Sequence, residues 1–457
     1  MMKKAVLYFV LSLLIFSANI ERALVVSQVF TGGRVQSIEY VTYRGKKIAF
    51  VARLSRGFVL MPESELLPPI KLYSEVNKFD PENPIIKAVL DEIYFKEELL
   101  SRKPFFKEIL NPRSGILQWR RIESGYLEGE FASPIVRTKW NQGYPYNYYA
   151  PVVGGKRTWA GCVATAFAQI MKYWNWPDVG KGSHSYSWNG TVLSASFNHV
   201  YYWNRMPLQL FSTSSFAEID AVAKLLYDVG IAFEMDYGVN GSAAYPSIAL
   251  KALPDYFKYS KGIVYKIRGE FENGKKWFLR MKWERDMKRP FEFTICSTEV
   301  CHAVVVDGYK ITGDSYLVHI NFGWSGYFDG YYGVDNINAG YNFNDTKNQD
   351  AVFNIFPKGM LFPPDSFTVV RHMDRGVFVH SYIDEIKMSR SPSVENNVVA
   401  YRIYVKKDGK IEKIWEGEYA PVVQIRSFDE NVSYGVSVVD AMGRESQISP
   451  FVSPESE

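Results

Sequence analysis

A cysteine stands at the predicted start of an amphipathic helix, and this feature constrains the chain most. Residues 161–173 have the sequence GCVATAFAQIMKY, in which apolar side chains recur at helical spacing. Gly161 ends any helix that arrives from upstream, so Cys162 falls in the first turn. Unpaired amides and the helix dipole favour a thiolate there, and a thiolate is a strong nucleophile. The alternative is that Cys162 is a small buried apolar side chain. The rest of the chain decides between these two interpretations.

Two predicted strands far downstream carry the partners that such a nucleophile needs. Residues 301–309 (CHAVVVDGY) predict a buried strand closed by Asp-Gly. Residues 316–326 (YLVHINFGWSG) predict a second strand that ends in a glycine-rich turn. A cysteine followed at a distance by His and then Asn is the order of papain-type nucleophiles. In such a site the His takes the thiol proton and the Asn orients the imidazole.

Two histidines compete for the role of base. His319 shares strand parity with Asn321, so both side chains point to one face of the predicted strand. His302 opens a separate strand, and Asn321 could reach it from a neighbouring one. A histidine in such a strand is commonly a core residue. The pattern favours His302 modestly and leaves His319 open.

Several segments resemble motifs of the streptopain family of cysteine peptidases. They stand in the family's order at 161–173, 302–308 (HAVVVDG), 321–326 and 329–332 (DGYY), and three shorter similar segments lie between residues 228 and 243. Segment 321–326 (NFGWSG) looks like the family's Asn-Trp-Gly-Trp-Gly-Gly turn. The resemblance runs from about Trp140 to about Pro357 and implies a papain-like catalytic domain of the α+β class.

The resemblance also implies roles for individual residues. Cys162 would be the nucleophile and His302 the general base and acid. Asn321 would orient His302, and Trp324 would shield their hydrogen bond from water.

An oxyanion donor is implied in the same way. Residues 140–147 (WNQGYPYN) resemble the segment that supplies the family's oxyanion glutamine, which corresponds to Gln142. Its side-chain amide would join the backbone amide of Cys162 at the developing negative oxygen. Without the resemblance, Gln142 would be taken for a solvated loop residue.

The chain departs from the family pattern at two positions near the base. Phe322 replaces the first tryptophan of the turn, and Cys301 precedes His302 where a glycine is more usual. Cys296 and Cys301 could close a small hairpin disulfide and leave Cys162 free, or both could be buried thiols. The cysteines and histidines do not have the spacing of a zinc site, and residues 342–350 lack a calcium-loop pattern. We therefore expect no metal and no cofactor.

The N-terminus predicts export. Lys3 and Lys4 precede an apolar run over 5–16 that is too short to span a bilayer, as in a signal peptide ending near residue 23. An uncleaved anchor is the alternative. The net charge of +4 shows no basic stripe, so we expect no nucleic-acid partner, and no membrane association after signal removal. The expected location is secreted, cell-surface or periplasmic.

Two regions flank the predicted peptidase domain of residues 130–358. Residues 24–129 predict strands and one amphipathic helix, and GFVL at 57–60 resembles the pro-region of streptopain relatives. This implies an α+β pro-domain that inhibits its own enzyme; a permanent N-terminal β domain is the alternative. Residues 359–457 predict an all-β sandwich of short strands. Segment 438–446 (VVDAMGRES) resembles a fibronectin type III module.

The sequence therefore predicts a secreted cysteine endopeptidase, made as a zymogen, that acts on protein or peptide substrates. Two other functions stay open: an acyl transferase or amidase on a papain-like core, and an inactive adhesion protein that acts through its C-terminal sandwich.

Overall fold

The structure is a computed structural model, and it describes residues 19–31, 33–65, 67, 69–74, 77–102, 119, 131–312, 315–375 and 380–456. The chain divides into two compact units. The first consists of Met1–Pro134, Phe271–Phe278 and Thr294–Gln349. The second consists of Ile135–Glu270, Leu279–Phe293 and Asp350–Glu457. This boundary runs through the predicted peptidase domain, so the division expected at residues 130 and 358 stays a prediction.

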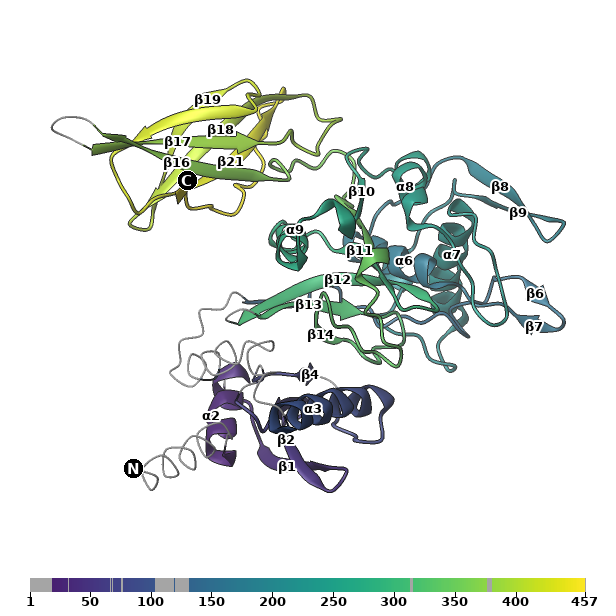
Figure 1. The fold of residues 1–457 in the computed structure, drawn as a ribbon. Helices are drawn as coiled ribbons and strands as arrows, with labels where there is room; N and C mark the ends of the chain where they lie inside the picture. The colour runs from purple at the N-terminus through teal and green to yellow at the C-terminus, as the bar shows by residue number, and fades with distance from the viewer. Residues whose placement is uncertain are drawn as a thin grey trace, which may run out of the picture. The chain divides into compact units, whose positions relative to one another are not determined.

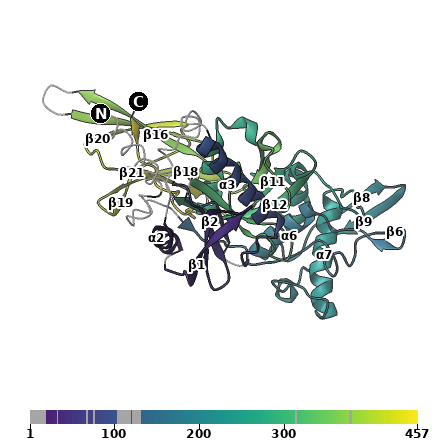
Figure 2. The ribbon, with the colours of Figure 1, turned by 60° about the horizontal axis from the view of Figure 1, so that its bottom comes forward.

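The N-terminal part of the first unit is a four-stranded antiparallel sheet with a helix on each face. Its elements are α2 (Ile20–Thr31), β1 (Ser37–Tyr43), β2 (Lys46–Arg53), β3 (Phe58–Pro62), β4 (Leu72–Ser74) and α3 (Pro84–Arg102), with the strands in sequential order (Figures 1 and 2). Alternate residues of β2 and β3 pack in two separate cores, one with α3 and the other with α2. Both faces are therefore buried, which explains the continuous apolar runs of these strands.

Helix α2 overlaps the C-terminal end of the predicted signal segment. Residues 1–18 of that segment lie outside the described residues. Residues 20–23 belong to α2, and Ala23 is fully buried in the core that this helix shares with the sheet. Within the described residues, no helix is both long enough and apolar enough to cross a membrane.

The second part of the first unit is an antiparallel ladder of β12 (Cys301–Thr312), β13 (Ser315–Asn321) and β14 (Gly330–Gly333). The short strand β5 (Phe131–Ala132) pairs with β12. The pairing of β12 with β13 places Val305 opposite Asn321 and Gly308 opposite His319, with an irregularity at Asp307. Nearly every residue of β12 is buried, as its β-branched run predicts.

The second unit is built around helix α6 (Cys162–Trp174), which packs against α7 (Phe216–Ala232) (Figure 1). Helix α7 starts with a capping box formed by Ser215 and Glu218. The remaining elements are β6 (Val152–Val153), β7 (Lys156–Arg157), β8 (Ser183–Trp188), β9 (Thr191–Ser196), η1 (Trp203–Arg205), η2 (Pro246–Ile248), α8 (Ala249–Phe257), β10 (Val264–Ile267), η3 (Arg268–Glu270) and β15 (Asp350–Phe353). Helix α9 (Gly274–Asp286) and strand β11 (Phe291–Cys296) each have residues in both units, and η4 (Thr346–Asn348) belongs to the first.

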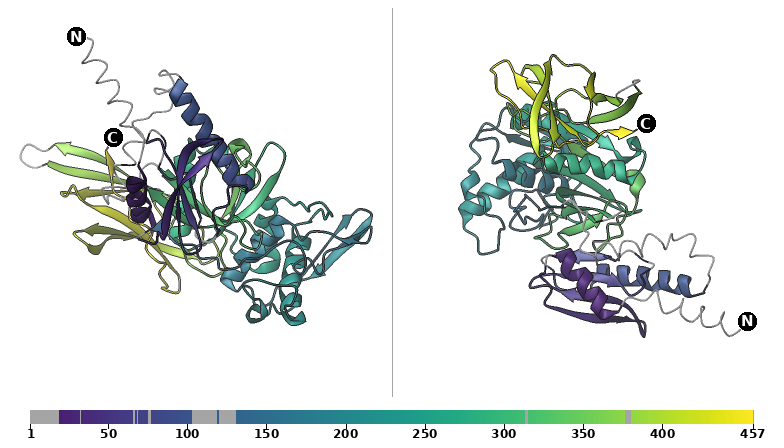
Figure 3. Two further views of the ribbon diagram at one scale, coloured as in Figure 1. Left: turned by 90° about the horizontal axis from the view of Figure 1, so that it is seen from below. Right: turned by 90° about the vertical axis from the view of Figure 1, so that its left-hand side faces the viewer.

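The C-terminal region forms the predicted β-sandwich, whose layers Figure 3 shows in green and yellow. Its strands are β16 (Phe367–Arg375), β17 (His380–Met388), β18 (Val398–Lys407), β19 (Lys410–Gly417), β20 (Val422–Ser427), β21 (Ser433–Asp440) and β22 (Glu455–Ser456). One sheet has the order β20-β17-β16-β22 and the other β19-β18-β21, with one shared apolar core.

The sandwich is fixed to the rest of the second unit. The carboxylate of Glu395 accepts hydrogen bonds from Ser260 Oγ at 3.0 Å and from the backbone N–H of Lys261 at 2.6 Å. Asp365 lies 3.4 Å from the fully buried guanidinium of Arg289. These contacts join the sandwich to the rest of the second unit.

Candidate active site

The candidate nucleophile, Cys162, lies in the second unit, at the first residue of α6. Gly161 stands at the N-cap with φ 93°, which favours glycine, and a Cβ there would lie 2.7 Å from the side chain of Met235. Cys162 is half-buried, and α6 is buried from Val163 to Met171. The helix N-terminus therefore presents the Cys162 thiol at a partly exposed position where the dipole favours the thiolate.

The segment that carries Gln142 is fixed to the residues just before Cys162. The Gln142 carbonyl accepts a hydrogen bond from the backbone N–H of Ala160 at 2.9 Å. The backbone N–H of Trp140 donates to Oε1 of Gln169 on α6 at 3.2 Å, and the Trp140 side chain is fully buried. Hydrogen bonds therefore join the segment of Gln142 to helix α6 and to the residues just before Cys162.

The candidate base, His302, lies in the first unit, on β12. Ring nitrogen Nε2 of His302 lies 2.8 Å from the carbonyl oxygen of Phe322. Because a carbonyl can only accept, Nε2 carries the proton and Nδ1 is the basic nitrogen. Burial lowers the pKa of His302 to about 4, although the hydrogen bond to Phe322 acts in the opposite direction. The ring is therefore neutral at physiological pH and able to accept a proton.

Aromatic rings enclose His302. Trp324 stacks on the imidazole with the centroids 4.5 Å apart, Phe343 lies at 6.2 Å and Phe322 at 6.3 Å. Phe322 thus keeps an aromatic wall where the family turn has a tryptophan. The half-buried Trp324 covers one face of the imidazole ring, and its shielding role stays a prediction.

The sequence placed Asn321 as the direct hydrogen-bond partner of His302, and the structure gives this place to the Phe322 carbonyl. The side-chain oxygen of Asn321 accepts the N–H of Gly323 at 3.0 Å. The Phe322 N–H donates to Asp329 at 3.0 Å, and Gly323 has φ 66°. Asn321 therefore shapes the turn that aims the Phe322 carbonyl at His302. A backbone carbonyl has no sequence motif, so the pattern could not have revealed this acceptor.

The competing histidine is held by a carboxylate. Nδ1 of His319 lies 2.6 Å from Oδ1 of Asp307, which is fully buried. The ring edge of His319 also meets Tyr331, with the centroids 5.1 Å apart. His319 has a buried partner within the ladder, in keeping with a structural role.

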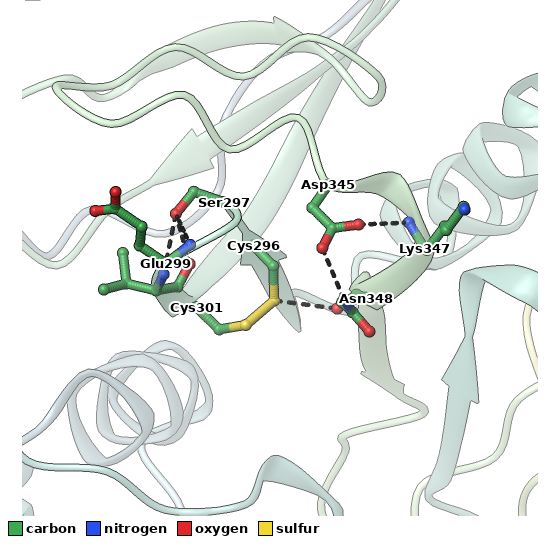
Figure 4. Close-up of a disulfide and its surroundings, with 8 residues drawn as sticks. Cys296, Ser297, Glu299, Cys301, Asp345, Lys347 and Asn348 are labelled. Carbon is green, nitrogen blue, oxygen red and sulfur yellow. Dashed lines mark hydrogen bonds between the residues drawn. A yellow bond between two sulfur atoms is a disulfide. The ribbon is translucent and has the colours of Figure 1, made fainter.

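The two cysteines before His302 form a disulfide, one of the two states that the sequence left open. Cys296 ends β11, Cys301 begins β12, and their Cα atoms lie 4.0 Å apart (Figure 4). In the turn between them, Ser297 Oγ accepts the N–H groups of Glu299 and Val300. The chain has three cysteines, all within the described residues, and Cys162 is the one outside this disulfide.

The region that carries these residues matches a known protein family. The model of the Peptidase C10 family matches residues 140–332, which include Gln142, Cys162, His302, Asn321 and Trp324. This part of the chain belongs to the streptopain family of cysteine-type endopeptidases. It is 28% identical to streptopain of Streptococcus pyogenes serotype M1, over 62% of this chain and 72% of streptopain.

Two further proteins are similar to this C10 family member. It is 29% identical to the thiol protease/hemagglutinin PrtT of Porphyromonas gingivalis, over 67% of this chain but only 35% of PrtT. A fragment of prointerpain A from Prevotella intermedia matches with a TM-score of 0.51 and 27% identity, over 70% of this chain and 99% of the fragment. This likeness confirms the predicted papain-like α+β fold. The family match ends before the C-terminal sandwich, whose likeness to fibronectin type III stays a prediction.

Proposed function

We propose that this C10 family member is a secreted endopeptidase, made as a zymogen, that cleaves proteins through a thioester on Cys162. The observation that carries the proposal is the half-buried thiol of Cys162 at the N-terminal end of α6, where the helix dipole favours the thiolate. It lies within the segment that matches the family. The neutral imidazole of His302 supports it, because such a ring can take the thiol proton.

The reaction has two acyl-transfer steps. Nδ1 of His302 takes the proton of Cys162, and the thiolate attacks the peptide carbonyl. As the C–N bond breaks, His302 returns the proton to the leaving amine, and the acyl group stays on sulfur as a thioester. His302 then takes a proton from water, the hydroxide attacks the thioester, and the thiol is restored with release of the acid. Gln142 and the Cys162 N–H would stabilise the oxyanion of each step.

Digestion of casein by the purified protein, with and without a thiol alkylator, tests this function. We expect internal cleavage that the alkylator stops, seen as new peptide termini by mass spectrometry. A free primary amine in the assay separates the alternatives: a transferase incorporates it into the product, and a peptidase yields free carboxylates. Intact casein under reducing conditions, after removal of the N-terminal domain, would refute the peptidase.

The N-terminal domain acts as the inhibitory pro-domain in this proposal. Its residues share a unit with His302, and Tyr73 of β4 stacks on Tyr331 of β14 at 5.9 Å. Lys310 of β12 is buried, donates to the Phe30 carbonyl at 2.9 Å and lies 3.1 Å from the centroid of the Phe30 ring. The relative prointerpain A is a precursor form and was solved with a cysteine-to-alanine substitution.

Maturation is expected to cut the chain between about Ser124 and Val136. Residues 124–130 lie outside the described residues, and Phe131–Ala132 pair with β12 at Lys310 and Tyr309. A cut before Phe131 would leave β5 on the enzyme. N-terminal sequencing of the active protein tests this. An active form that still begins near Leu24 would favour a permanent N-terminal domain.

Replacing Lys310 is expected to speed maturation. Lys310→Met removes a buried charge that lies within 6 Å of the rings of Phe30, Tyr73 and Phe131. Its cation–π and charged hydrogen-bond contacts contribute about 2 kcal/mol to holding the domain. The precursor should therefore process itself up to about 30-fold faster, measured by gel densitometry over time. Lys358→Met, at an exposed position, is the control, and equal rates for both variants would contradict the anchoring role.

A further inference from the structure

Trp159, three residues before the nucleophile, is bonded to the loop of residues 238–242 by three hydrogen bonds. Its backbone N–H donates to the Gly238 carbonyl at 3.1 Å, and its indole Nε1–H donates to the Val239 carbonyl at 2.9 Å. Its own carbonyl accepts the hydroxyl of Ser242 at 2.7 Å. The indole is fixed in orientation although the residue is 40% exposed.

The same ring meets the segment that carries Gln142. A Cβ placed on Gly143 would lie 2.9 Å from Cζ3 of Trp159, so the ring edge abuts the backbone at Gly143. On the other side, the Gln142 carbonyl accepts the N–H of Ala160, the residue after Trp159. The Gln142–Gly143 backbone is therefore fixed by a hydrogen bond from Ala160 and by the ring of Trp159.

We propose that Trp159 is a positioning residue that holds Gln142 in place for oxyanion stabilisation beside Cys162. The inference rests on the oxyanion role given to Gln142 in the proposed function. A donor to an oxyanion must be placed before the reaction, and a displacement of about 1 Å can cost up to about a hundredfold in rate. Because the oxyanion forms only in the transition state, loss of the ring lowers kcat and leaves KM nearly unchanged.

Two substitutions of Trp159 test the ring and its hydrogen bond separately. Trp159→Ala removes both, and kcat for a peptide substrate should fall about 10- to 100-fold, with KM changed less than about twofold. Trp159→Phe keeps a ring beside Gly143 but loses the N–H to Val239, so it should recover most of the rate. A kcat of Trp159→Ala equal to that of the wild type would overturn the inference.

Alkylation of Cys162 by iodoacetamide separates positioning from damage. The thiolate displaces iodide from carbon, a step that needs the thiolate but forms no oxyanion. The alkylation rate of Trp159→Ala should therefore equal that of the wild type while hydrolysis is slow. A parallel fall of both rates would show general disruption around the thiol and overturn the inference.

Combination with Gln142→Ala shows whether Trp159 acts through Gln142. Gln142→Ala alone should lower kcat about 100- to 1,000-fold. The double variant should be no slower than Gln142→Ala, because the residue that Trp159 positions is already absent. If the loss of kcat in the double variant equals the product of the two single losses, the inference about Trp159 is overturned and the oxyanion role of Gln142 stands. A normal kcat for Gln142→Ala would overturn the oxyanion assignment in the proposed function.

Gly143→Ala probes the same contact from the other side. Gly143 does not have a positive φ, so alanine suits its backbone, but the new Cβ meets the Trp159 ring. We expect Gly143→Ala to lower kcat in the wild type and to have no further effect in Trp159→Ala. Equal losses in both backgrounds would overturn the proposed contact between the ring and the Gln142–Gly143 backbone.

Discussion

Cys162→Ala should abolish proteolysis and leave the fold intact. The nucleophile is lost completely, and because the same loss in a serine peptidase lowers turnover by about a million-fold, we expect a loss of similar size here. Alanine favours helix, and the half-buried position at the start of α6 leaves a small cavity at most. The precursor should accumulate at full length, because self-processing needs the same thiol. Casein cleavage and gel electrophoresis of the expressed protein measure both effects.

A matched control for Cys162→Ala removes the sulfur atoms of the other two cysteines. The double variant Cys296→Ser with Cys301→Ser loses the disulfide but keeps Cys162, so it should retain cleavage that an alkylator stops. Circular dichroism and thermal unfolding of Cys162→Ala should match those of the wild-type precursor. Near-normal turnover in Cys162→Ala would show that the nucleophile does not lie on α6.

The elements that carry the site were predictable because each has one strong periodic pattern. The apolar stripe after Cys162 predicted α6, and the β-branched run after His302 predicted β12. The spacing of short strands predicted the C-terminal sandwich, and its two sheets have one common core. The local sequence pattern is sufficient to predict a helix or strand where burial of one of its faces determines that element.

The contacts that refine the site could not be predicted, because they depend on backbone atoms and on residues distant in the sequence. The acceptor of His302 is a main-chain carbonyl, and the ring of Trp159 meets a glycine 16 positions earlier. The Cys296–Cys301 bridge depended on the approach of two strand ends, which spacing leaves open. Helix α2 was missed because the apolar start of the chain predicted a signal segment up to residue 23.

His302→Ala should lower turnover by about 10⁴-fold or more, while His319→Ala should mainly lower stability. His302 supplies the proton acceptor, whereas His319 is hydrogen-bonded to the buried Asp307. Loss of that hydrogen bond should cost about 2 kcal/mol in the free energy of unfolding. Asn321→Ala should be milder than His302→Ala, because it disturbs the turn that aims the Phe322 carbonyl and removes no proton acceptor. Reversed phenotypes of the two histidine variants would assign the base to His319.

The pH dependence of stability gives His302 a second, independent test. Burial lowers its pKa from 6.5 to about 4, so between these values the unfolded chain binds a proton that the folded protein does not. Acid therefore favours unfolding. The contribution of neutral His302 to the free energy of unfolding is complete above about pH 6.5. It is lost as the pH falls toward 4, by up to about 1.4 kcal/mol per pH unit. Urea unfolding of the inactive Cys162→Ala precursor between pH 7 and 4 measures the slope. Adding His302→Ala should flatten it, and an unchanged slope would contradict a neutral, buried imidazole at this position.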